Sequence, residues 1–160
     1  MIAWRFARFE ELDAREMHDI LQARAAVFIV EQDCVFQDVD GVDPACWHLW
    51  ASEQGVVLSY CRLVPPGLKF PEASIGRVIT TQPGRGRGLG RSLMAQALAR
   101  SHELWPGQAL RIGAQQYLEA FYGGFGFARC SEPYDEDGIM HIEMLRQAPG
   151  ARSQEPGATK

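Results

Sequence analysis

The alternation of apolar and polar residues divides the chain into short strands and a few helices. Residues 2–9 alternate around Trp4 and Phe6, which predicts a first strand. From Leu12 to about Val30 the apolar residues recur every three or four positions, which predicts an amphipathic helix. The other expected elements are strands at 46–52, 56–64, 75–81, 108–113, 127–131 and 138–145, a turn at 133–135, and helices after residue 89 and over 118–125.

Residues 74–99 combine a strand, a glycine-rich turn and a helix. Residues 75–81 are apolar and β-branched, as in a buried strand. They lead to Gly86, Gly88 and Gly90, where the missing Cβ lets the backbone turn sharply and approach a ligand. The free amides of the first helical turn then attract an anion. This stretch therefore predicts a binding site for a phosphate or a pyrophosphate.

Three phosphate-binding patterns compete for this stretch. A P-loop ending at Gly90 requires glycine at position 85 and lysine at position 91, and the chain has arginine at both. The dinucleotide pattern G-x-G-x-x-G fails from either Gly84 or Gly86. The pattern R/Q-x-x-G-x-G/A does match. It is carried by Arg85, Gly88 and Gly90.

Length and charge limit the class of protein. The chain has 160 residues, enough for one domain with a proper core. Its net charge of −4 argues against wholesale binding of nucleic acid. No apolar run approaches the roughly 20 residues that cross a bilayer, and no leader segment is visible. We therefore expect a cytoplasmic protein.

Cysteine spacing and buried charge refine this interpretation. The four cysteines form no C-x-x-C pair, so neither a metal site nor a disulfide framework is indicated. Arg24 falls in the apolar stripe of the predicted helix and needs a carboxylate or a ligand there. Acidic residues follow within a short broken region, where one or two could pair with Arg24 or meet a cationic substrate: Glu31, Asp33, Asp38, Asp40 and Asp43.

The glycine loop and its surroundings resemble the acyl-CoA pyrophosphate loop of the GNAT superfamily of N-acyltransferases. Several stretches are similar to its ElaA-like branch: Arg24 with VFIVEQ at 27–32, residues 38–41, the run from Arg62, and EDGIMHIEM from Glu136. The resemblance implies an α/β (α+β) fold, with a mixed, largely antiparallel central sheet flanked by helices. It implies one GNAT-like domain over 1–147. We expect a disordered tail at 148–160, where Pro, Gly, Ser and charged residues dominate.

The same resemblance assigns a donor site for acetyl-CoA, bound as a co-substrate. The backbone of Val78, Ile79 and Thr80 would follow the pantetheine arm, and Tyr122 stands at the family's general-acid position. Gln115 stands where the family often has an asparagine that touches the pantetheine arm. The residues expected around the diphosphate are Arg85, Gly86, Arg87, Gly88, Leu89, Gly90 and Arg91.

Acetyl transfer to an amine also needs a base, because a lysine-type amine with a pKa of ~10.4 is protonated at neutral pH. In some family members a carboxylate on the central strand takes this proton, but residues 73–81 contain no Asp or Glu. Glu31 is our first candidate, because it ends the helix that carries Arg24. The other candidates are Asp38, Asp40, His48 and His141. A backbone amide near Ile79 is expected to hold the oxyanion.

These observations favour an N-acetyltransferase that uses acetyl-CoA and a small-molecule or peptide amine. The amine attacks directly in a ternary complex. A non-catalytic module that binds or senses acyl-CoA is the alternative, because the strand carboxylate is missing. A nucleotide-phosphate enzyme is a third interpretation. We expect no nucleic acid, membrane or metal among the partners, and a homodimer is one option for the assembly.

Overall fold

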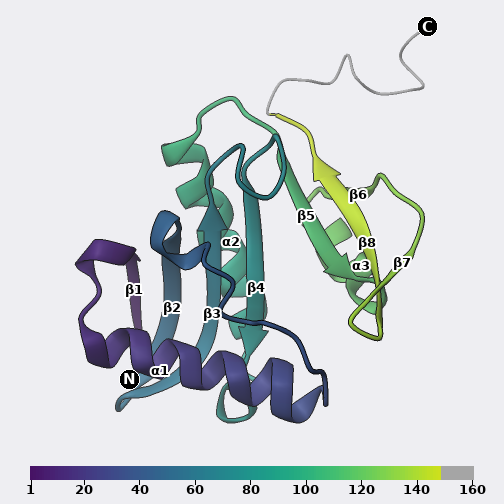
Figure 1. The fold of residues 1–160 in the computed structure, drawn as a ribbon. Coiled ribbons are helices and arrows are strands. Elements are labelled where there is room, and N and C mark those ends of the chain that lie inside the picture. Colours follow the sequence, from purple (N-terminus) through teal and green to yellow (C-terminus); the bar gives the residue numbers. More distant parts are fainter. Residues whose placement is uncertain (149–160) are drawn as a thin grey trace, which may run out of the picture.

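The computed structural model describes residues 1–148 and arranges their strands in two sheets (Figure 1). The first sheet is antiparallel, in the order β1-β2-β3-β4. In the second sheet β8 pairs antiparallel with β5, β6 and β7. The strands are β1 (Ala3–Arg8), β2 (Trp47–Glu53), β3 (Val56–Val64), β4 (Ser74–Thr80), β5 (Leu110–Gln115), β6 (Ala128–Arg129), β7 (Tyr134–Glu136) and β8 (Ile139–Arg146). The largely antiparallel sheet predicted from the sequence is confirmed.

Three α-helices accompany the sheets: α1 (Ala14–Arg24), α2 (Leu89–Leu104) and α3 (Glu119–Gly123). Helix α1 begins with a capping box, in which Asp13 and Glu16 each accept a hydrogen bond from the other's backbone N–H. The helical path continues beyond α1 as a wider π-helix over Ala25–Glu31, which we call the π-segment. The long helix predicted here is therefore confirmed in extent, but its pitch changes at residue 25.

The two longer helices cover opposite faces of the first sheet. On one face, Ile20 of α1 and Val27 of the π-segment pack with Tyr60 and Ile79. On the other face, α2 forms a larger core that includes residues of both sheets. Its buried members include Leu63, Ile75, Leu93, Met94, Ala97, Ile112, Tyr122, Ile142 and Met144. The core under α2 thus joins the two sheets, while α1 covers only the first.

The two sheets meet at one point and then diverge. The backbone N–H of Arg111 donates to the carbonyl of Ala73 at 3.0 Å, in an isolated parallel bridge between Ala73 and Leu110. Beyond this bridge β4 and β5 separate, as Figure 1 shows. Strand β4 also contains one extra residue opposite β3, and Arg77 there has φ of +50°. This bulge lies in the part of β4 that faces the gap.

Some predicted boundaries are wrong. The turn expected at 133–135 is instead the short strand β7, and the chain reverses at Asp137 and Gly138, both with positive φ. The strand expected at 127–131 contains only the two paired residues of β6. The expected tail at 148–160 lies outside the described residues except for residue 148. No helix in the described part of the chain is long and apolar enough to cross a membrane.

Candidate active site

A cavity of about 630 Å³ fills the gap between β4 and β5. Both strands contribute to its wall, together with the end of the π-segment, α3 and the turn between β7 and β8. A pocket of this size is in the range that holds a cofactor-sized molecule. The predicted site residues that line it are Glu31, Val78, Ile79, Thr80, Arg85, Gly90, Gln115, Tyr122 and His141.

The glycine loop places a row of free amides at the start of α2. Gly86 and Gly88 have φ of +76° and +73°, which a residue with a Cβ adopts only with strain. Ser92 is the first helical residue whose N–H donates, to the carbonyl of Gly88. Among the described residues, nothing accepts a well-formed hydrogen bond from the N–H groups of residues 86–91. The loop thus offers unpaired donors to an anion.

The arginines of the loop are already engaged by carboxylates. Arg85 bonds to Glu31 and also donates from Nε to the carbonyl of Thr80 at 3.1 Å. Arg87 bonds to Glu53 at 3.1 Å. Of the predicted diphosphate set, only Arg85 and Gly90 line the cavity itself. The other residues of the set lie outside the cavity wall.

Gly84 is a positioning residue that the sequence analysis did not single out. A Cβ added at this position would lie 2.4 Å from the carbonyl oxygen of Leu58 in β3. Any side chain here would push the start of the loop away from the sheet. The signal in the sequence was one more glycine in a run already rich in glycine, so it did not stand out.

The backbone of β4 presents alternate residues to the gap. Thr81 donates its N–H to Leu58 of β3 at 2.9 Å, and Ile79 pairs with Tyr60. Because N–H groups alternate along a strand, those of Val78 and Thr80 point away from β3, toward β5. The carbonyl of Thr80 is occupied by Arg85. Val78, beside the bulge, therefore has the amide best placed to bind a ligand in the cavity.

Tyr122 lies at the inner wall of the cavity. Only 5% of the residue is exposed, and its ring packs edge-on against Phe121 and Phe127. Burial raises the pKa of Tyr122 well above its ordinary value of 10.0. The phenol therefore remains protonated at any physiological pH and is available as a proton donor.

Two hydrogen bonds tie the segment after the π-segment to the second sheet. Gln115 at the end of β5 donates to the side-chain carbonyl of Gln32 at 3.2 Å. The thiol of Cys34 donates to the backbone carbonyl of Asp137 at 2.8 Å. Both bonds link residues that line the cavity. They close the side of the gap that faces α1.

The candidate bases separate into two groups. Glu31 and His141 line the cavity, whereas Asp38, Asp40 and His48 do not. His48 is fully buried between the hydroxyl of Tyr60 and the carbonyl of Asp43, and burial lowers its pKa. It has no access to the cavity. The structure thus brings two of the five candidates into the site.

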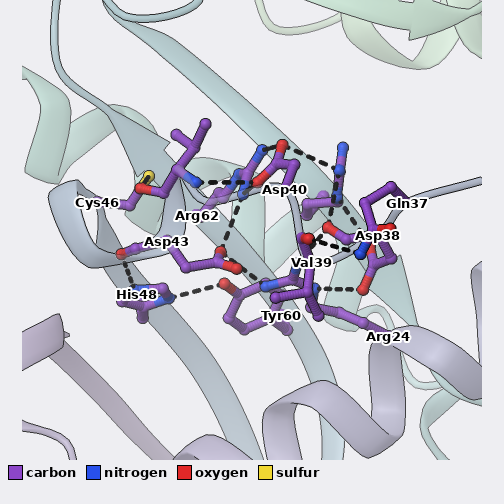
Figure 2. A network of polar contacts seen from close by, with 12 residues as sticks. Arg24, Gln37, Asp38, Val39, Asp40, Asp43, Cys46, His48, Tyr60 and Arg62 are labelled. Atoms are coloured by element: carbon purple, nitrogen blue, oxygen red, sulfur yellow. Dashed lines mark hydrogen bonds and ion pairs between the residues drawn. The ribbon is translucent and has the colours of Figure 1, made fainter.

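Three of the five acidic residues predicted near Arg24 form a largely buried ion cluster with arginines, shown in part in Figure 2: Asp38, Asp40 and Asp43. Arg24 is completely buried, as the sequence predicted, and bonds to Asp38 at 3.1 Å and to Asp43 at 2.8 Å. Arg62 binds both oxygens of Asp40 and one of Asp43. Arg24 therefore has carboxylate partners, which was the requirement inferred from its position in the apolar stripe.

This cluster also supports the bulge of β4. Arg77, the residue with positive φ, pairs with the carboxylate of Asp38 at 2.9 Å and donates to its backbone carbonyl at 3.0 Å. Its guanidinium also lies 5.5 Å from the ring centre of Phe36. These contacts hold Arg77 in a backbone conformation that its side chain disfavours. Asp38 thus shapes the cavity wall through Arg77 without lining the cavity itself.

We predict that acid weakens the fold through this cluster. Burial alone would raise the pKa of Asp40 and Asp43, but hydrogen bonds from Arg62 and Arg24 outweigh it and hold both pKa values below 3.8. A carboxylate with a lowered pKa stabilises the fold above its unfolded pKa and loses that contribution as the pH falls. Urea unfolding should therefore show a lower midpoint at about pH 3 than at about pH 7.

The control for this prediction is Asp40→Asn, which removes one of the titrating groups. The variant should be less stable than the wild type at neutral pH, and its midpoint should fall less on acidification. If the wild type and the variant lose the same stability between the two pH values, Asp40 does not contribute to the acid sensitivity.

The chain belongs to the GNAT acetyltransferase family, because residues 21–147 match the acetyltransferase (GNAT) domain. Among its relatives are a UPF0039 protein of Synechocystis, 40% identical over 92% of this chain and 97% of the relative, and the ElaA protein of Escherichia coli, 37% identical over the same shares. These relatives support the ElaA-like branch predicted from the sequence.

Solved structures agree with this assignment. An acyl-CoA N-acyltransferase from Pseudomonas aeruginosa superimposes with a TM-score of 0.87 at 39% identity, covering 91% of this chain and 99% of the other. The crystal structure of Escherichia coli ElaA gives a TM-score of 0.86 at 36% identity, covering 92% of this chain and all of the other. The predicted GNAT fold is confirmed, and the family supports acyl transfer as the general class of reaction.

Proposed function

We propose that this protein transfers an acetyl group from acetyl-CoA to a primary amine by direct attack in a ternary complex. The observation that supports this most is the cavity between β4 and β5, which is lined by Thr80, Arg85 and Gly90 together with Tyr122. Unpaired amides at residues 86–91 suit the diphosphate, and the gap accommodates the pantetheine arm. The wall thus combines donor-binding groups with a proton donor.

Different residues of the cavity carry out different steps of the reaction. The N–H of Val78 stabilises the negative charge that develops on the thioester oxygen when the amine nitrogen bonds to the carbonyl carbon. Tyr122 gives its phenolic proton to the sulfur as the carbon–sulfur bond breaks. Gln115 contacts the pantetheine arm through its amide. A base in the cavity takes the proton that the amine loses, and Glu31 and His141 are the candidates.

The direct test uses acetyl-CoA with a panel of small amines and short peptides. Release of free thiol and the mass of the acetylated product are measured together. Product formation that depends on the amine supports the transferase. Tight binding of acetyl-CoA without any acetylated product would instead support a binding or sensing module, which the absence of a carboxylate on β4 favours.

A second experiment tests the donor loop. The substitution Gly88→Trp should abolish the thermal stabilisation by CoA, because the new side chain blocks the loop amides. In the wild type, ligand at about 100 times its Kd should raise the Tm by roughly 5–10 °C. Differential scanning fluorimetry with and without CoA measures this shift.

Gly107→Trp is the matched control for the donor loop. Gly107 also has positive φ, and a Cβ there meets nothing within 4 Å, but it lies in the turn after α2. The two variants should lose similar stability without ligand, and only Gly107→Trp should keep the CoA shift. A full CoA shift in Gly88→Trp would exclude this loop as the diphosphate site.

A further inference from the structure

His141 lies on the face of the second sheet that is opposite to Tyr122. It pairs with Gln115 of β5 and with Tyr134 of β7, whose ring stacks on it at 6.0 Å between centres. Residues paired across a sheet share one face, so these three side chains lie together. The next residue, Ile142, points into the core under α2, which also contains Tyr122. His141 and Tyr122 thus line one cavity from opposite faces.

This arrangement matches the geometry of direct acyl transfer. The incoming nitrogen and the departing sulfur occupy different sides of the carbonyl carbon, so a base for the nitrogen and an acid for the sulfur belong on opposite sides of it. Tyr122 is the proposed acid. A base that lines the cavity from the opposite face of the second sheet is therefore placed to take the proton of the amine. His141 lies on that face.

The hydrogen bonds of His141 leave one ring nitrogen ready to accept a proton. Nδ1 lies 2.8 Å from the backbone carbonyl of Ile139. A carbonyl can only accept, so Nδ1 carries the hydrogen and Nε2 of the neutral ring carries the lone pair. A carboxylate oxygen of Glu136 lies 3.9 Å from Nε2, where it faces the charge that develops as the amine proton is transferred.

Glu31 is less suited to the same role. Its carboxylate is bound by Arg85, which is also a predicted ligand of the diphosphate. Arg85 Nη2 occupies Oε1 of this carboxylate, so Glu31 is already committed to an ion pair with the donor loop. Glu31 therefore serves to hold Arg85 at the cavity wall.

We infer that His141 is the general base, and that its Nε2 takes the proton of the amine as the nitrogen attacks the thioester carbon. The inference rests on the proposed acetyl transfer. It assigns the proton lost by the amine to His141 and the proton gained by the sulfur to Tyr122, so each proton has a donor and an acceptor.

The test compares two amines of different basicity in the variant His141→Gln. Butylamine is almost fully protonated at about pH 7.5, like any amine with a pKa of ~10.4. Trifluoroethylamine is largely neutral there, because its fluorines lower its basicity. Loss of the base should reduce kcat/KM by about 100-fold for butylamine and by only about five-fold for trifluoroethylamine. The thermal shift with CoA should remain as in the wild type.

Two comparison variants complete the test. His102→Gln, an exposed position on α2, should leave both amines unaffected. Glu136→Gln changes a side chain that is 56% exposed, so the variant should fold normally. It should reduce kcat/KM by about three-fold for butylamine and hardly at all for trifluoroethylamine. This second variant keeps the inference testable if His141→Gln does not fold.

Three results would overturn the inference. In the first, His141→Gln loses equal activity with both amines while CoA binding is intact, which means that the ring only shapes the cavity. In the second, Glu31→Gln and not His141→Gln shows the loss that depends on amine basicity. In the third, Glu136→Gln affects both amines equally. Failure of the proposed function itself looks different, because the wild type would then acetylate neither amine.

Discussion

Replacing Tyr122 by phenylalanine should lower kcat for acetyl transfer by about 100-fold and leave CoA binding unchanged. The phenol is buried in the cavity wall, and burial raises its pKa above the ordinary value of 10.0, so it enters the reaction protonated. Without it the sulfur must leave as an unprotonated thiolate. The ring that packs on Phe121 and Phe127 is kept. Steady-state kinetics with saturating amine measure the change.

Tyr117→Phe is the matched control for Tyr122→Phe. Tyr117 also lines the cavity but is 75% exposed, so its hydroxyl is solvated and its loss should cost little. Both variants should show the CoA-dependent thermal shift of the wild type. An unchanged kcat in Tyr122→Phe would remove the phenol from the mechanism, and a lost thermal shift would show that it binds the donor.

The elements around the donor loop could be predicted because their signals are local. Apolar and β-branched residues at 75–81 predicted a strand that the structure has as Ser74–Thr80. The glycines at 86 and 88 predicted a sharp turn, and both have positive φ. Helical periodicity after residue 89 predicted α2. Each of these features depends on the chain within a few residues of itself.

The features that the sequence analysis missed depend on contacts between distant segments. The bulge at Arg77 is held by Asp38, which is 39 residues away along the chain. The π-segment continues directly from α1. Its apolar residues recur as in an ordinary helix, so no pattern in the sequence marks the change of pitch. The importance of Gly84 is visible only once Leu58 lies beside it. No local pattern encodes these pairings.

The ranking of the candidate bases illustrates the same limit. The sequence analysis ranked Glu31 first among the bases because it ends the helix that carries Arg24. Glu31 does line the cavity. Its bond to Arg85 joins residues 54 positions apart and could not be foreseen. His141 ranked lower because nothing in its neighbourhood in the sequence reveals that β8 carries it to the gap.

The substitution Arg24→Met should destabilise the protein by about 3–5 kcal/mol. Methionine matches much of the length of arginine, so the change removes the charge and leaves little empty space. Asp43 then keeps only Arg62, and Asp38 keeps only Arg77, while both carboxylates stay buried. A buried carboxylate that loses an arginine costs far more than the ion pair itself contributes. For a domain of this size the Tm should fall by on the order of 10 °C.

Arg15→Met is the control for Arg24→Met, since Arg15 lies in the same helix with an exposed side chain. It should change the Tm by no more than about 1–2 °C. Adding Asp43→Asn to Arg24→Met should recover part of the lost stability, because it removes one of the uncompensated charges. Equal Tm values for the two single variants would show that the cluster does not stabilise the fold. In that case the bulge of β4 must be held by the pairing of its own strand rather than by the arginine cluster.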